Sequence, residues 1–146
     1  PGMIIFQMSI SLLYQFWIHT ELIQKTPKWI EFFFNTPSHH RVHHGSNPIY
    51  LDRNHAGILI IWDKLFGTFQ PELKSEKVKY GLVVNIKTYN PIFIAFNEWG
   101  ALFKDLNTKN ISVRDRIRYL YKPPGWKHDG TGKLSTDLKE EWLKEN

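Results

Sequence analysis

Apolar residues fill most of the first 18 positions of the chain, and no formally charged side chain precedes Glu21. Polar residues interrupt this stretch at every fourth position, namely Gln7, Ser11, Gln15 and His19. Residues spaced by four lie on one face of an α-helix. The pattern therefore predicts a helix over residues 1–24 that is apolar except for one slowly drifting polar stripe.

This first predicted helix has two interpretations. Its roughly 18 uncharged residues reach the lower limit for crossing a bilayer whose hydrocarbon core is about 30 Å thick. Because polar groups in lipid are costly unless they face other protein, a membrane helix would point its stripe at a bundle interior. The alternative is a buried helix of a soluble domain. Both interpretations direct His19 inward, and the missing basic flank and cleavage site argue against a secretory signal.

The rest of the pattern predicts shorter elements. An aromatic run over 29–34 leads to a helix that Asn35 or Thr36 can cap and Pro37 can begin, because proline is tolerated at the first helical position. Further along, the pattern predicts a short buried or interfacial helix over 56–66, a strand-like stretch at 80–85, and helices over 92–103 and 113–121, the last capped by Ser112. One short strand makes no sheet, so the pattern is mainly helical.

The composition limits which partners the chain is expected to bind and which atoms could hold a metal. A chain of 146 residues has the length of one domain, and no repeat or linker demands a second. The net charge of +5 would suit nucleic acid, but no nucleic-acid-binding motif accompanies it, so no nucleic acid partner is expected. If the first helix spans a membrane, the basic flank favours a cytoplasmic side facing anionic lipid. The chain has no cysteine, so a metal would be held by nitrogen and oxygen.

The most specific pattern is the run His39-His40-Arg41-Val42-His43-His44. In a helix, residues 39 and 43 and residues 40 and 44 form two i,i+4 pairs on adjoining stripes, so several imidazoles can converge on one point. Neutral imidazoles suit zinc, copper, iron or nickel, and the spacing does not choose among them. The alternative is a solvated basic turn, which so dense a histidine run makes the weaker interpretation.

Several ordered motifs resemble the C-terminal part of the fatty acid hydroxylase and sterol desaturase superfamily. They are Gln15-Phe16-Trp17-Ile18-His19-Thr20-Glu21, Asn35-Thr36-Pro37-Ser38-His39-His40-Arg41-Val42-His43-His44-Gly45, Asn54-His55-Ala56-Gly57 and Trp62-Asp63-Lys64-Leu65-Phe66-Gly67-Thr68-Phe69. The resemblance runs from about residue 10 to 85, with a weaker echo at 122–126. Within the superfamily, the chain most resembles bacterial relatives of alkylglycerol monooxygenase.

The resemblance implies an all-α fold, a membrane-embedded helical bundle with a cytosolic helical cap. Residues 1–146 would be the C-terminal part of one domain: residues 1–24 the last membrane helix, 35–70 the histidine box and cap, and 71–146 a basic C-terminal region. The family's earlier histidine boxes do not occur in this sequence. The chain is therefore expected to be a fragment, inactive without the missing N-terminal part. Its expected location is the bacterial inner membrane, with the histidine site on the cytoplasmic side.

The resemblance also assigns metal ligands. His40, His43 and His44 match the family's last His-x-x-His-His box, and His19 matches the histidine of the preceding membrane helix. Some relatives carry a further histidine one turn before His19, where this chain has Gln15, so no ligand role is assigned to Gln15.

Other polar residues are expected to support the ligands. Metal-bound histidines need hydrogen-bonding partners that fix their tautomers. The candidates for this role are His39, Glu21 and Asp63, although a surface position at a helix end is the alternative for each carboxylate. His55 is placed outside the site.

The activity that the resemblance implies is O₂-dependent hydroxylation or desaturation of a fatty acyl, alkyl or sterol lipid at a di-iron centre. The expected partners are the lipid, O₂, an electron donor and the missing N-terminal part, and zinc can replace iron in vitro. Candidates for the donor are a pterin such as tetrahydrobiopterin, a haem protein and a ferredoxin. Two alternatives remain: a non-catalytic membrane protein with a structural zinc–histidine site, and a soluble binding module.

Overall fold

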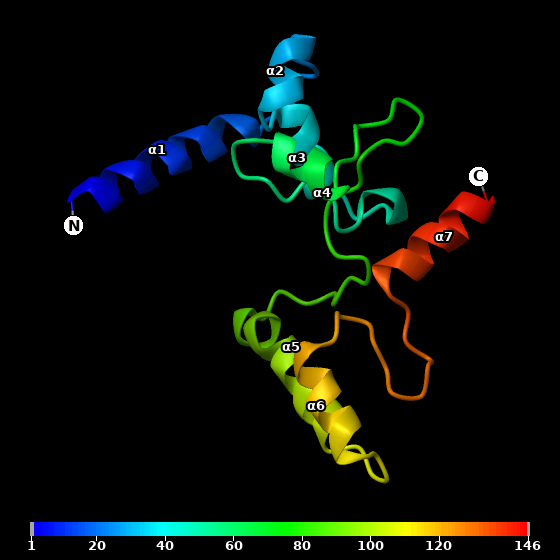
Figure 1. Cartoon of the computed structure of the whole chain (residues 1–146). Coiled ribbons are helices and arrows are strands. Elements are labelled where there is room, and N and C mark those ends of the chain that lie inside the picture. The colour runs from blue at the N-terminus through cyan, green and yellow to red at the C-terminus, as the bar shows by residue number, and fades with distance from the viewer. Residues whose placement is uncertain (1, 146) are drawn as a thin grey trace. The chain divides into compact units, whose positions relative to one another are not determined.

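The computed structural model describes residues 2–145, and those residues form helices and loops without any β-strand (Figure 1). The chain divides into two compact units, Pro1–Val83 and Val84–Asn146. The all-helical class is confirmed. The strand-like stretch at 80–85 was a wrong expectation, because Tyr80 makes only an isolated antiparallel bridge to Gly45 and no partner strand extends it. The single-domain boundaries stay a prediction, and their end points, residues 1 and 146, lie outside the described residues.

The first unit is built from short helices around the histidine run. Its elements are α1 (Gly2–Ile18), α2 (Lys28–Phe33), α3 (Pro37–His43), the 3-10 helix η1 (Pro48–Tyr50) and α4 (Ile61–Phe66). Helix α1 contacts α3. This contact brings the end of the first apolar segment to the helix that carries the histidines.

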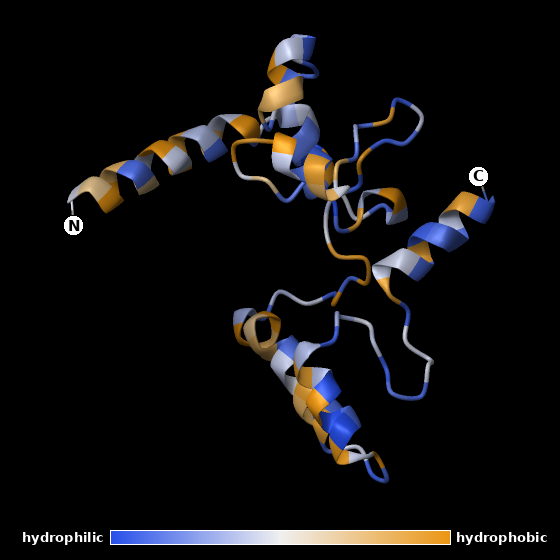
Figure 2. Cartoon of the chain, in the orientation of Figure 1, coloured by the Kyte–Doolittle hydropathy of each residue, from blue (hydrophilic) through white to orange (hydrophobic). Residues whose placement is uncertain are grey.

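Hydrophobic residues recur along the whole of helix α1 (Figure 2). Most of its large apolar side chains are exposed, from Met3 (78% exposed) to Phe16 (82% exposed), and Ile18 is buried. Among residues 2–145, no helix has both the length and the apolar character needed to cross a bilayer. The membrane helix expected over 1–24 thus stays a prediction.

Helix α1 ends at Ile18, six residues earlier than the pattern predicted. The backbone beyond it turns away, and the carbonyls of Thr20, Ile23 and Gln24 accept hydrogen bonds from the Arg41 guanidinium. Backbone polar groups need partners when they leave a helix. A side chain from α3 supplies them here, so the helix can stop at the residue before His19.

Helix α3 begins as predicted, with Pro37 at its start and Thr36 in the preceding N-cap position. The Thr36 side chain, however, makes no capping hydrogen bond. Asn35 instead ties the start of α3 to a distant loop: its N–H donates to the Ile58 carbonyl at 2.7 Å and its side-chain amide donates to the Ala56 carbonyl at 2.6 Å. The helix is therefore fixed by long-range bonds rather than by a local cap.

The helix predicted over 56–66 forms only from Ile61 onward, as α4. The cause is Asp63, a carboxylate that is 2% exposed and accepts hydrogen bonds from the backbone N–H groups of His55 and Ala56. Those bonds hold residues 55 and 56 in an irregular turn. In a continuous helix over 56–66 these groups would lie about two turns apart, roughly 10–12 Å along the axis, so the bonds require an irregular backbone before α4.

Buried polar side chains hold the rest of the first unit together. Asn54 adopts a left-handed backbone (φ 54°), and its side chain donates to the carbonyls of His39 and Gln70 at 3.0 and 2.8 Å. Tyr50 is fully buried and its hydroxyl donates to the Glu76 carbonyl at 2.8 Å. These bonds pin the loop after α4 and the segment 70–76 against the back of α3.

The second unit contains three helices: α5 (Pro91–Leu106), α6 (Val113–Tyr121) and α7 (Ser135–Glu145). Asn90 caps α5 by accepting from Ile92 and Phe93, and Ser112 caps α6 by accepting from the Asp115 N–H at 3.1 Å. The predicted cap at Ser112 is confirmed. Helix α7 was missed, because its polar sequence shows too weak an apolar stripe to distinguish it from a tail.

Candidate metal centre

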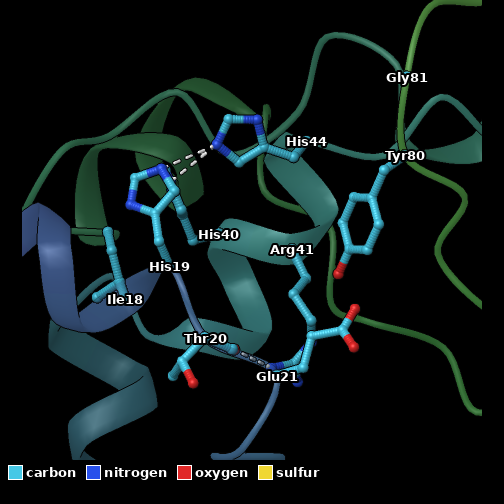
Figure 3. Close-up of a pocket in the computed structure, with 9 residues that line it drawn as sticks. All are labelled: Ile18, His19, Thr20, Glu21, His40, Arg41, His44, Tyr80 and Gly81. Carbon is cyan, nitrogen blue, oxygen red and sulfur yellow. Dashed lines mark hydrogen bonds between the residues drawn. The ribbon is translucent and has the colours of Figure 1, made fainter.

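Three histidines converge at the junction of α1 and α3. The Nε2 atoms of His19 and His40 lie 2.8 Å apart, those of His40 and His44 lie 3.1 Å apart, and those of His19 and His44 lie 3.2 Å apart. Figure 3 shows the His19 and His44 rings turned toward one another across the end of α3. Three lone-pair-bearing nitrogens at this spacing form a compact triad of donors. We call His19, His40 and His44 the histidine triad.

The triad is assembled from two segments. His40 lies on α3, and His44 caps the end of that helix one turn later, so their rings share a face. His19 is the first residue after α1, and its Nδ1 donates to the Gln15 carbonyl at 2.5 Å. A proton on Nδ1 leaves the lone pair of Nε2 free to bind a metal, and this is the tautomer that a metal ligand needs.

The electrostatics favour neutral imidazoles. Burial, and then the neighbouring His19, His44 and His43, lower the pKa of His40 to about 3. Burial followed by the charges of His43 and His19 also lowers the pKa of His44. Because a metal binds the unprotonated ring, both side chains are ready to bind one at neutral pH.

The triad fits a first-row transition metal. Three nitrogens at these separations lie about 1.8 Å from their common centre, slightly less than a metal–nitrogen bond of about 2.0–2.1 Å. All three can therefore bond one ion placed just outside their plane. An all-imidazole donor set suits iron and zinc alike.

His43 lies beside the triad but outside it. Its ring stacks on that of His40 with centroids 5.3 Å apart, and it stands 6.2 Å from the ring of His55. The His43 Nδ1 donates to the Arg53 carbonyl at 3.4 Å, which again leaves Nε2 free. The structure thus gathers three of the four predicted ligands around one point and leaves the fourth exposed next to them.

The three expected supporting residues lie in different places. His39 is buried on the other side of α3, where its ring meets Phe69 edge-on at 5.2 Å and burial lowers its pKa. Asp63 binds the turn at 55–56 and shows no hydrogen bond to a triad histidine. Glu21 lies beside the triad, where its carboxylate faces Tyr80 (Figure 3).

A pocket of about 460 Å³ opens beside the triad. Beyond the histidines, its lining includes Ile18, Thr20, Glu21, Tyr80 and Gly81. Burial, with a hydrogen bond to Glu21 as the next contribution, raises the pKa of the Tyr80 phenol to about 12. The pocket therefore combines an apolar wall with a neutral phenol and a carboxylate, next to the nitrogens that can bind metal.

Sequence reasoning missed two residues of this site. Arg41 appeared only as part of the histidine run and was given no role of its own, although a charged residue inside such a run on a packed helix is a signal for a buried ion pair. Tyr80 gave no signal, because a single tyrosine before a glycine is unremarkable and its approach to the histidines depends on the tertiary fold.

Comparison with known proteins agrees with these motifs. A family model described as fatty acid hydroxylase matches residues 1–68. The alkylglycerol monooxygenase of Homo sapiens is 45% identical over 141 residues, covering 97% of this chain, and that of Xenopus tropicalis is 43% identical over 145 residues, also covering 97%. This chain spans 30% of the length of each of these relatives. No solved structure matches it.

Proposed function

This chain belongs to the fatty acid hydroxylase superfamily, and from that premise we propose that it forms the metal-binding part of an O₂-dependent lipid hydroxylase. The observation that carries the proposal is the histidine triad, whose three Nε2 atoms lie within 3.2 Å of one another. The relatives named alkylglycerol monooxygenase suggest an alkylglycerol as the lipid.

We propose iron as the metal, with His19, His40 and His44 binding one ion and His43 serving a second. The free Nε2 of His43 next to His40 supports that assignment. Bound iron would supply the redox chemistry that lets O₂ attack an unactivated C–H bond. Over the reaction, one oxygen atom enters the substrate, and the other leaves as water after taking up two electrons and two protons from an electron donor. The donor, for which a pterin is one candidate, and further ligands from an N-terminal part are elements of the same proposal.

The protein's own residues have definable tasks in this proposal. The pocket beside the triad would hold the reacting part of the lipid, with Ile18 on its wall and Thr20 and Tyr80 offering hydroxyl groups. The Tyr80 phenol, whose single O–H is held by Glu21, would offer its oxygen as an acceptor to a hydroxyl group of the substrate. The exposed apolar side chains of α1 support a location within or against the bilayer, where such lipids are found.

A structural zinc site is the second candidate. Three imidazoles, with one further ligand, complete the tetrahedral set of a structural zinc, and this chain supplies the three unaided. A zinc site of that kind would bind tightly but would show no O₂-dependent turnover.

The test is oxygenation of a long-chain alkylglycerol by membranes containing the protein, supplied with O₂ and a reduced pterin. We expect His44→Ala and His43→Ala to abolish turnover while leaving the amount of protein in the membrane unchanged. The matched control is His128→Ala, because His128 is also a histidine but bonds to Tyr119, a residue of its own second unit. Full activity in His44→Ala would refute the proposal, and a zinc-loaded, inactive wild type would favour the structural alternative.

A further inference from the structure

The Arg41 side chain lies under the histidine triad with every donor engaged. Its Nε donates to Glu72 Oε1 at 3.0 Å, and one Nη2 bond reaches Glu72 Oε2 at 2.6 Å. The remaining bonds go to backbone carbonyls: Nη1 donates to Thr20 (3.1 Å) and Ile23 (2.9 Å), and Nη2 donates to Gln24 (2.8 Å). A guanidinium has five N–H groups in a fixed plane, so this set uses all five.

The ion pair between Arg41 and Glu72 is largely buried, and a third side chain supports it. Arg41 is 7% exposed and Glu72 is 20% exposed. Ser38, one turn earlier on α3, donates its hydroxyl to Glu72 Oε2 at 2.8 Å, the oxygen that also accepts from Arg41 Nη2. The carboxylate is thus held by two side chains on one face of α3, and the planar fork of Arg41 has a single orientation in which all its bonds are made.

These bonds join the two segments that build the triad. Arg41 follows His40 directly on α3, whereas the three carbonyls belong to the segment that follows His19 directly. On the other side of His19, helix α1 is fixed by the Tyr14 hydroxyl, which donates to the Asn35 carbonyl at 2.6 Å. Residues 20–24, which lack helical structure, are secured by Arg41.

We propose that Arg41, held by Glu72, is a positioning residue that fixes His19 at metal-binding distance from His40 and His44. The inference rests on the proposed metal-binding function of the triad. Without the guanidinium, three carbonyls lose their donors and the segment after His19 is free to rearrange. The His19 ring would then lose its fixed place opposite α3, and the site would retain two nitrogens in place of three.

The test uses cobalt(II) as a probe of the triad in the full chain, purified in detergent. Cobalt(II) binds imidazole nitrogen, and its visible absorption responds to the number and geometry of its ligands. The variants are Arg41→Lys, which keeps the charge but cannot form five directed bonds, and Glu72→Gln, which keeps the shape but removes the ion pair. The matched control is Lys64→Met, because Lys64 donates to two backbone carbonyls of the same unit, those of Glu31 and Phe32, away from His19.

We expect Arg41→Lys to weaken cobalt binding by about 10- to 100-fold and to change its absorption spectrum, as loss of a ligand-orienting partner does. Glu72→Gln should weaken cobalt binding to a smaller extent, and its absorption spectrum should lie between those of the wild type and Arg41→Lys. Lys64→Met should match the wild type in cobalt affinity and in absorption spectrum. A merely structural role for Arg41 would lower the unfolding temperature without altering the spectrum of the bound cobalt at low temperature.

The outcomes separate this inference from the proposed function. If the wild-type chain binds no cobalt, the metal-binding function fails and the inference falls with it. If the wild type binds cobalt and Arg41→Lys binds it with the same affinity and spectrum, the inference is overturned and the function stands. If Arg41→Lys does not fold, Glu72→Gln decides, and wild-type affinity in that variant overturns the inference.

Discussion

Replacing Asp63 by asparagine tests how the loop beneath the metal centre is held. The Asp63 carboxylate is buried, and its two oxygens divide three donors between them. Oδ1 accepts from the His55 N–H at 2.8 Å and the Thr68 hydroxyl at 2.5 Å, and Oδ2 accepts from the Ala56 N–H at 2.8 Å. Asparagine has nearly the same shape but offers one oxygen and no charge.

The expected cost follows from these bonds. The two bonds to Oδ1 can persist with a neutral acceptor, each weakened by about 0.5–1 kcal/mol. The Ala56 N–H faces an amide donor in the variant and loses its partner, which costs about 1–2 kcal/mol. Together these effects predict that Asp63→Asn lowers the free energy of unfolding of the first unit by about 2–4 kcal/mol.

Amide hydrogen exchange measures this effect at the residues concerned. A loss of that size should lower the protection of the His55 and Ala56 amides by about 30- to 1,000-fold. The control is Asp129→Asn, in which an exposed carboxylate accepts from the Thr131 N–H and hydroxyl and water can replace it without loss. A change of less than about fivefold at both amides would refute the assigned role of Asp63.

Two further predictions concern pH and backbone conformation. Burial raises the pKa of Glu72, but hydrogen bonds from Arg41 and Ser38 outweigh burial and hold it below the ordinary 4.5. This contribution to stability is complete above pH 4.5 and is lost as the pH falls through the lowered pKa. Glu72→Gln should therefore flatten the fall in unfolding temperature below pH 4.5, and an unchanged slope of unfolding temperature against pH would contradict this. At the left-handed Asn54, replacement by alanine should cost about 2–4 kcal/mol in urea unfolding. Glycine should cost about 1 kcal/mol less, because it adopts that backbone freely, and equal costs would exclude backbone strain.

Local signals in the sequence predicted local features of this molecule. Pro37 at the first position of a helix and Ser112 as a cap each depend on bonds or sterics within a few residues, and both are where the sequence placed them. The i,i+4 spacing of His40 and His44 likewise brought their rings together. Features that depend on tertiary contacts were not predicted, namely the early end of α1 and the late start of α4.

The causes of those errors are specific. Helix α1 stops at Ile18 because Arg41, on another helix, satisfies the carbonyls beyond it. Helix α4 starts at Ile61 because the Asp63 side chain binds the amides of residues 55 and 56, which it could not reach from a continuous helix over 56–66. In both places one buried charged side chain outweighs the helical pattern, and the groups that it binds are determined by the tertiary fold.

The proposal that the histidine triad binds a catalytic metal can be checked by elemental analysis of the protein, purified in detergent from iron-supplied cells. The same measurement is made on a variant with His19, His40 and His44 all replaced by alanine. We expect bound iron in the wild type, about two ions for a two-metal site, and loss of iron in the triple variant. Zinc alone, no metal, or an unchanged iron content in the triple variant would contradict the proposal.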